Sequence, residues 1–148
     1  MSELLLVVTI GGRRAAVRAS EVQSVIELEA MTPVPRAPAY VMGMAALRSR
    51  ALTVINCARS LALPETGPNQ DAARPVTVVV EHDGHLYGLL VDAVDDVVES
   101  HDGLSELRAN PGHGWKQASL GVTESPLGPL IVLDPVMLVG GPPVEQPV

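Results

Sequence analysis

Short apolar runs alternate along the chain with clusters of glycine, proline and charged residues. Each run is rich in valine, leucine, isoleucine or alanine. Runs of this length between turn-forming residues are typical of β-strands, whereas helices need longer segments with a 3.6-residue period. The chain is therefore predicted to be mainly β, with strands at residues 4–10, 14–18, 26–31, 41–47, 51–55, 76–81, 85–91, 120–123 and 130–134, and a bent strand over 91–97.

Three of the junctions between these strands predict tight hairpin turns. Gly11-Gly12 and Asp83-Gly84 supply the positive φ angles that two-residue turns require. The third junction, Arg48-Ser49-Arg50, is charged although both flanking strands are apolar. We expect Arg48 and Arg50 to be either the solvent-exposed end of a hairpin or a point of contact with a partner.

Three short helices are expected among the strands. A capping box, with Ser at the cap and Gln three residues later, predicts a helix over residues 20–25. Asn56 is suited to cap a second helix over residues 57–61, which Pro64 ends. The third covers residues 135–139 and begins with proline, which is favoured at the first helical position.

The remaining segments are rich in proline, glycine and polar residues. Three prolines within residues 32–38 exclude a helix or a central strand there. Residues 64–75 hold no apolar run and are predicted to be a surface loop. Residues 100–119 are predicted to be irregular, and residues 140–148 to be a flexible tail.

The length of 148 residues suits one domain, residues 1–148, or two small barrels that share a core. Strand-rich halves lie at about residues 4–63 and 76–139, and an exchange of strands between them stays open. Hydrophobic residues make up 47% of the chain, but there is no phenylalanine, one tryptophan and two tyrosines. The core must be built from valine, leucine, isoleucine, alanine and methionine, which favours strands.

The net charge of −7 argues against a nucleic-acid-binding protein, because ten Lys and Arg against seventeen Asp and Glu leave little room for a basic face. No run approaches the ~20 apolar residues that span a bilayer. The amino terminus lacks the basic flank and cleavage site of a signal peptide. A single cysteine cannot form an internal disulfide. Together these features predict a soluble, cytoplasmic protein.

Residues that could carry chemistry are few. His82 and His85 flank a turn, but a metal site needs three or four converging ligands, and no other histidine or cysteine has supporting spacing. Asp92, Asp95 and Asp96 could act as acid–base groups only if burial or mutual repulsion shifted a pKa. Solvated histidines and an exposed acidic edge are the preferred interpretations.

Cys57 lies near the start of a short helix, which could lower its pKa, but a buried small hydrophobic residue is the preferred interpretation. The chain contains no P-loop, no Gly-x-Ser-x-Gly and no dinucleotide-binding fingerprint. We therefore expect no catalytic residue, no bound metal and no cofactor. A small enzyme that uses Asp92, His82 or His85 is the rival from another class.

Residues 40–61 resemble the CheW-like domain, the adaptor fold of bacterial chemosensory arrays. That family's Gly-x-x-x-Leu-Arg-Gly motif is matched by Gly43, Leu47 and Arg48, and a following arginine by Arg59. Three positions depart from the family's pattern, namely Ser49 in place of glycine, Thr53 in place of proline and Asn56 in place of aspartate.

The resemblance extends from residue 4 to residue 139. Val22 and Val25 occupy the places of the family's Val-x-x-Val/Ile motif. Residues 34–43 resemble its proline-containing crossing, and residues 88–97 resemble its second-half signature. The resemblance therefore covers nearly the whole chain.

The resemblance implies a fold of two packed five-stranded SH3-like β-barrels with a few short helices. It also implies a non-catalytic adaptor that couples chemoreceptors (methyl-accepting chemotaxis proteins) to a CheA-type histidine kinase in chemotaxis or motility control. The partners would be the cytoplasmic tip of the receptor and the regulatory domain of the kinase, with no nucleic acid and no membrane insertion. The expected partner-binding residues are Val22, Val25, Gly43, Leu47, Arg48, Arg50 and Arg59.

Alternatives stay open at this point. The chain could be a diverged adaptor that binds receptor but has lost or altered kinase coupling, or that serves another output pathway. The two valines and Leu47 could equally be core residues. Arg48 could lie over its own hairpin or pair with Asp92 or Glu99.

Overall fold

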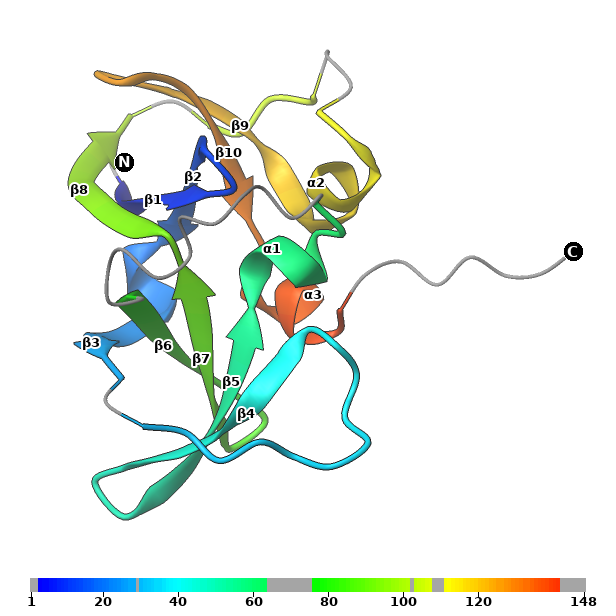
Figure 1. Cartoon of the computed structure of the whole chain (residues 1–148). Coiled ribbons are helices and arrows are strands. Elements are labelled where there is room, and N and C mark those ends of the chain that lie inside the picture. The colour runs from blue at the N-terminus through cyan, green and yellow to red at the C-terminus, as the bar shows by residue number, and fades with distance from the viewer. Residues whose placement is uncertain (1–2, 29, 64–75, 102, 108–110, 142–148) are drawn as a thin grey trace, which may run out of the picture.

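Two five-stranded sheets form the framework of the molecule (Figure 1). The computed structural model describes residues 3–28, 30–63, 76–101, 103–107 and 111–141. The strands within them are β1 (Glu3–Ile10), β2 (Arg13–Arg18), β3 (Val22–Glu27), β4 (Val41–Leu47), β5 (Arg50–Asn56), β6 (Val76–His82), β7 (His85–Val91), β8 (Ala93–Ser100), β9 (Ser119–Ser125) and β10 (Gly128–Leu133). The helices are the 3-10 turn η1 (Ala19–Glu21), α1 (Cys57–Ser60), α2 (His113–Ala118) and α3 (Pro135–Val139).

The middle of the chain forms one sheet and the two ends form the other. The first sheet has the order β8-β1-β2-β10-β9, and the second has the order β3-β6-β7-β5-β4. The pairs β2–β10 and β5–β7 are parallel, and the other neighbours are antiparallel. The strand-rich halves at 4–63 and 76–139 do not coincide with these sheets, because β1 and β2 pair with β8 and β10 across the division.

The three predicted hairpins β1–β2, β4–β5 and β6–β7 are confirmed within one residue at each end, and the strands predicted at 120–123 and 130–134 form a fourth hairpin, β9–β10, within two residues. β1–β2, β4–β5, β6–β7 and β9–β10 are each joined by a tight turn. The predicted bent strand is β8, whose pairing with β1 shifts register between Val7 and Val8. Such a shift lets β8 curve around the first sheet.

Each sheet is closed toward a barrel by a contact at its edge. In the first sheet the hydroxyl groups of Ser100 on β8 and Thr123 on β9 lie 2.6 Å apart and share a hydrogen bond. In the second, Thr32 exchanges two backbone hydrogen bonds of 2.8 Å with Met44, so the proline-containing segment covers the edge of β4. Edge strands without such cover would invite pairing with other chains.

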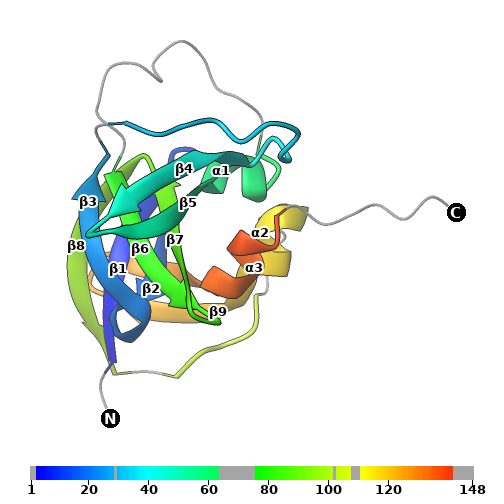
Figure 2. The same ribbon diagram turned by 90° about the horizontal axis from the view of Figure 1, so that it is seen from below.

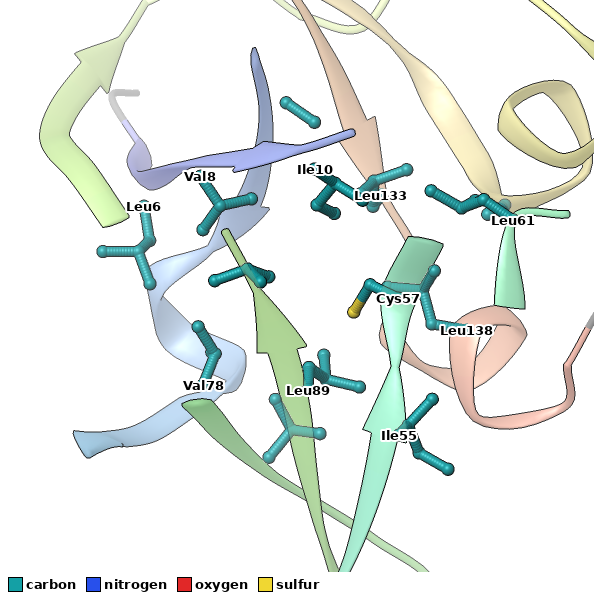
Figure 3. Packing of buried hydrophobic residues seen from close by; sticks show 14 of the residues in the cluster. Leu6, Val8, Ile10, Ile55, Cys57, Leu61, Val78, Leu89, Leu133 and Leu138 are labelled. Atoms are coloured by element: carbon teal, nitrogen blue, oxygen red, sulfur yellow. The ribbon is translucent and has the colours of Figure 1, made fainter. Parts of the chain in front are cut away.

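Buried side chains divide into three clusters that follow the alternation of strand residues. On β1, Leu5 and Val7 belong to the cluster inside the first sheet, whereas alternate residues face the second sheet. Figure 3 shows this inter-sheet cluster, in which Leu6, Val8 and Ile10 of β1 lie opposite Ile55, Val78 and Leu89. A third cluster, around Leu52, lies on the other face of the second sheet. Both faces of β1 are buried, which explains its unbroken apolar run.

The helix predicted over residues 20–25 is wrong. The chain makes only the 3-10 turn η1 and is already extended at Val22, with φ −92° and ψ 124°. β3 then pairs with β6, and the strand ends at Glu27 rather than continuing to residue 31. Valine and isoleucine favour strands, so pairing with β6 outweighs the local capping pattern.

The other two predicted helices are confirmed. The Asn56 side chain accepts a hydrogen bond of 3.1 Å from the backbone N–H of Arg59 and caps α1. Asp134 caps α3 in the same way, accepting from the backbone N–H of Val136 at 3.0 Å. Both caps satisfy a donor that the first helical turn leaves free.

One helix, α2, lies in a segment that was predicted to be irregular. Its Trp115 is 2% exposed and belongs to the inter-sheet cluster. Its Gly114 packs so closely on the backbone of Leu61 that an added Cβ would collide with the Leu61 carbonyl group. The helix therefore forms where the chain docks on the end of α1.

Two predicted segments fall largely outside the described residues, namely the loop at 64–75 and the tail, of which 142–148 are not described. In the part of the chain that the structure describes, no helix combines the length and the apolar character needed to cross a bilayer.

Candidate functional site

The turn between β4 and β5 carries one predicted partner-binding residue, Arg48, and one departure from the family pattern, Ser49. Leu47 pairs with Arg50 across the hairpin, which leaves Arg48 and Ser49 as the two turn residues. Their φ angles are 50° and 71°, as a two-residue turn of this twist requires. Both residues are exposed, and the hairpin extends beyond the rest of the second sheet (Figure 1).

Arg50 is bound within the molecule. Its guanidinium group donates to a carboxylate oxygen of Glu81 at 3.4 Å and to the carbonyl oxygen of Gly84 at 3.1 Å. The Glu81 carboxylate also accepts from the Gln23 side chain at 2.6 Å. The hydrogen bond from Gln23, together with that from Arg50, holds the pKa of Glu81 below its usual value. Arg50 therefore ties the β4–β5 hairpin to the β6–β7 turn.

Arg48 makes no hydrogen bond or ion pair with any described residue. It does not pair with Asp92 or Glu99, the two carboxylates considered from the sequence. Arg50 beside it is already matched by Glu81. The tip of the hairpin therefore presents one positive charge that no other described group balances, on a protein whose net charge is −7.

Gly43 and Leu47 have clear roles in packing. Gly43 is buried, and a Cβ at this position would lie 2.6 Å from the carbonyl oxygen of Thr32. Leu47 is partly buried and packs on the cluster of Leu52, Val79 and Leu86. These contacts favour the core interpretation of Leu47, of which only part is open to a partner, and they give Gly43 a packing role where partner binding was predicted.

Arg59 lies after the far end of β5, away from the hairpin turn. Its guanidinium group donates to the carbonyl oxygen of Ala39 at 3.1 Å and to the sulfur of Met42 at 3.6 Å. These bonds fasten α1 to the start of β4. The structure therefore separates Arg59 from Leu47, Arg48 and Arg50, which it brings together.

Val22 and Val25 lie on β3, an edge strand of the second sheet. Val22 is partly buried against the inter-sheet cluster, whereas Val25 is 43% exposed. Among the apolar side chains exposed on the first sheet, Leu4 on β1 (54%) and Val97 on β8 (52%) are the most exposed. Both views place β3 and β8 on the same side of the molecule (Figures 1 and 2).

The sequence did not single out Leu4 and Val97, because each lies in a predicted strand whose solvent-facing positions the sequence pattern did not distinguish. Val97 pairs with Leu6 on β1, and Leu4 pairs with Glu99 on β8, so they lie on one face of the sheet. Leu6 is covered by the second sheet, but Leu4 lies two residues nearer the strand end. We call Leu4, Val25 and Val97 the apolar side surface.

The candidate chemical groups are engaged in structural contacts. Asp92 accepts from the backbone N–H of Gly11 at 2.8 Å, and Asp95 accepts from the hydroxyl of Thr9 at 2.6 Å. Both carboxylates thus help to hold β1 and its turn against β8. Cys57 is buried, and burial raises the pKa of its thiol to about 12, which excludes a reactive thiolate near neutral pH.

His82 and His85 lie opposite each other at the end of the β6–β7 hairpin. His82 Nε2 lies 3.4 Å from a carboxylate oxygen of Asp83. Among the described residues, no group of three or more histidine, cysteine, aspartate or glutamate side chains is arranged to hold a metal ion. The arrangement is that of solvated turn residues.

A cleft of about 1030 Å³ opens on the first sheet beside β9, β10 and residues 103–107. The Arg13 guanidinium group near it lies 5.4 Å from the centre of the Trp115 ring and donates to the carbonyl oxygen of Pro111 at 3.2 Å. The lining of the cleft carries charges of both signs, because Arg14 and Glu124 both contribute to it. None of the predicted partner-binding residues lines this cleft.

Comparison with known proteins adds an independent line of information. The family model of the CheW-like domain matches residues 4–141. The chain is 31% identical over 98 residues to "Chemotaxis protein CheW" of Rhizobium meliloti (strain 1021), a match that covers 66% of this chain and 61% of that protein. It is 36% identical over 84 residues to "Probable chemotaxis protein CheW" of Rhizobium etli, covering 55% and 52%. The matched segments thus span only about half to three fifths of these two relatives.

Two further matches are more extensive but more distant. "Chemotaxis protein CheW" of Bacillus subtilis (strain 168) is 24% identical over 122 residues, which is 82% of this chain and 75% of that protein. The crystal structure of scaffolding protein TtCheW from Thermoanaerobacter tengcongensis superimposes with a TM-score of 0.77 over 90% of each chain, at 19% sequence identity. The structural likeness confirms the predicted fold of two packed five-stranded barrels.

Proposed function

This chain belongs to the CheW-like domain family, and from that premise we propose that it is a non-catalytic signalling adaptor that couples chemoreceptors to a CheA-type histidine kinase. The observation that carries the proposal is the match of the family model over residues 4–141, nearly the whole chain. The relatives that the chain matches are named as chemotaxis proteins. The proposed place of action is the cytoplasm, at a receptor array.

An adaptor without catalysis must offer its partners accessible surface, and two features of the molecule support this. The β4–β5 turn presents the unbalanced charge of Arg48. The guanidinium group of arginine donates in a fixed fork, which suits a carboxylate or the free carbonyl groups at a helix end. We therefore assign the turn to a partner with an acceptor-rich, acidic surface.

The second feature is the apolar side surface of Leu4, Val25 and Val97. Leu4 and Val97 lie on the neighbouring strands β1 and β8, and Val25 lies on β3 of the other sheet, on the same side of the molecule. Apolar residues scattered singly are common on proteins, but a group of them on one side is typical of contact with another protein. The two features differ in chemistry, one being charged and the other apolar. An adaptor that holds two different partners together needs such a difference.

A diverged adaptor that binds receptor but has altered kinase coupling is the second candidate. Thr53 and Asn56, two of the three departures from the family pattern, make internal bonds. The Thr53 hydroxyl donates to the sulfur of Met44 at 3.2 Å, and Asn56 caps α1. Ser49, the third departure, makes no hydrogen bond with a described residue. Of the three departures, Ser49 is therefore the one whose side chain is available to change the contact with a partner.

The proposal is tested with the purified full chain and two purified probes from the same organism, a chemoreceptor cytoplasmic fragment and the regulatory domain of the histidine kinase. Each probe is immobilised in turn, and binding is measured by surface plasmon resonance. Binding to both supports the coupling adaptor. Binding to the receptor fragment alone supports the diverged adaptor, and binding to neither would refute both.

A further inference from the structure

Three tight turns of this molecule have the same backbone geometry but different residues. Both central residues have positive φ in each case, with 59° and 83° at Gly11-Gly12, 51° and 78° at Asp83-Gly84, and 50° and 71° at Arg48-Ser49. The second position is glycine in two turns and serine in the third. Glycine adopts this conformation freely, whereas a residue with a Cβ is strained there.

No contact within the described part of the molecule compensates for the strain at Ser49. Its side chain is exposed, and its hydroxyl group makes no hydrogen bond with a described residue. Asparagine and aspartate reach the left-handed region more readily than serine does. Serine at position 49 therefore lowers the stability of the isolated protein relative to glycine, and no contact with a described residue offsets this loss.

From this strain and exposure, we infer that Ser49 is a specificity-determining contact residue whose hydroxyl group, beside the Arg48 guanidinium, hydrogen-bonds to a carboxylate-bearing patch of the partner. The inference rests on the proposed function, because it concerns the partner of the same turn. Strain at exposed backbone positions is characteristic of functional sites, where a bound partner uses the geometry.

The chemistry of the turn agrees with a carboxylate-bearing partner. Arg48 carries the charge, because Arg50 is occupied by Glu81 and Gly84. Arginine supplies up to five N–H donors and serine adds one O–H donor on the next residue. Two adjacent donor groups can engage one carboxylate from two directions, which favours binding of an acidic partner. A purely apolar partner would leave both donor groups without acceptors, which disfavours its binding.

Two substitutions separate the hydroxyl group from the backbone. Ser49→Gly removes both the strain and the hydroxyl, whereas Ser49→Ala keeps a Cβ at positive φ and removes the hydroxyl only. We expect Ser49→Gly to raise the melting temperature by a few degrees and Ser49→Ala to leave it nearly unchanged. Both should weaken binding of whichever probe the wild-type chain binds through Arg48 by about tenfold.

The control is Gly12→Ser, which places a strained serine in the β1–β2 turn, where an added Cβ meets nothing within 4 Å. It should lower the melting temperature and leave binding unchanged. The Arg48→Ala chain identifies which of the two probes, the receptor fragment or the kinase regulatory domain, uses this turn.

The outcomes distinguish this inference from the proposed function. If the wild-type chain binds neither probe, the proposed function fails and the inference fails with it. If the wild-type chain binds but Ser49→Ala binds equally well, the inference alone is overturned. A tenfold loss in Ser49→Ala, with an unchanged melting temperature and an unaffected Gly12→Ser control, supports it.

Discussion

The inter-sheet core and the β4–β5 turn use their residues in contrasting ways. Around Trp115 the side chains of both sheets and all three α-helices are buried against one another. At the turn, Arg48 and Ser49 are exposed and make no hydrogen bond or ion pair with described residues. The difference teaches that the buried cluster contributes to folding, whereas the turn presents polar groups that a partner can engage. Substitutions should therefore affect folding in the first region and association in the second.

The largest effect is expected from Trp115→Ala. Removal of this 2% exposed ring from the core should lower the free energy of unfolding by about 3–5 kcal/mol. It would also remove the surface over which Arg13 lies. Urea denaturation followed by circular dichroism measures the change. Leu127→Ala, at a side chain that is 39% exposed, serves as the control. A loss below 1 kcal/mol for Trp115→Ala would mean that α2 is not part of the core.

Gly43→Ala tests a residue that the sequence assigned to partner binding and that the structure packs inside. The new Cβ would lie 2.6 Å from the Thr32 carbonyl oxygen and disturb the two bonds between Thr32 and Met44. We expect the free energy of unfolding to fall by about 1–3 kcal/mol. The control is Gly103→Ala, where an added Cβ meets nothing within 4 Å. Wild-type stability with lost binding would instead make Gly43 a direct contact.

Arg48→Glu should act on association alone. The melting temperature should stay within a few degrees, because no internal ion pair is lost, while binding of the acidic partner weakens by about 1–3 kcal/mol. Arg14→Glu makes the same change in net charge on the first sheet and is the matched control. Unchanged binding in a folded Arg48→Glu chain would remove Arg48 from the site, and unfolding would place Arg48 among the stabilising residues.

The smallest effect concerns Glu21, in the turn η1 between the two sheets. One of its carboxyl oxygens is buried with no hydrogen-bond partner among the described residues. Burial raises the pKa of this carboxyl above its usual 4.5, the charges of Asp134 and Glu3 raise it further, and Arg18 opposes them. The folded state therefore holds the proton more tightly than the unfolded state does. The stability that the protonated Glu21 carboxyl group contributes is fully present below about pH 4.5 and is lost as the pH rises through the pKa of the folded state.

Glu21→Gln removes the charge that the site disfavours. The melting temperature should rise by about 1 °C at pH 8 and should not rise at pH 4, since much of the side chain is near solvent. Calorimetry at the two pH values measures the difference, with the exposed Glu106→Gln as the control. An equal gain at both pH values would show that the charge of Glu21 is not the cause.

The local parts of the fold could be predicted from the sequence, because they depend on neighbouring residues. Alternating apolar runs with Gly11-Gly12 or Asp83-Gly84 between them specify hairpins, and Asn56 specifies the start of α1. The capping pattern at residues 20–25 misled, because the pairing of β3 with β6 joins residues about fifty or more positions apart in the chain, from Glu27 with Val76 to Val22 with Val80. The helix α2 was missed because its cause is the docking of Gly114 on Leu61.

The candidate site shows the same limit. The turn itself, with Arg48 at its tip, could be located from two apolar runs that flank charged residues. The ion pair of Arg50 with Glu81 could not be predicted, because Glu81 lies on β6 and comes near Arg50 only in the folded sheet. The exposure of Leu4 and Val97 also depends on where the second sheet ends. The alternation of apolar and polar residues does not predict that boundary, because it is set by how the two sheets pack.

The nested arrangement of the sheets has a consequence for the order in which the chain is made. The second sheet uses a continuous stretch from β3 to β7 and has all its strands once residue 91 has left the ribosome. The first sheet must wait for β10, whose Ile131 pairs with Ala15 of β2. During synthesis, β1 and β2 remain without their later neighbours while the whole second sheet is completed. Their apolar residues are then the part of the nascent protein most in need of protection by a chaperone.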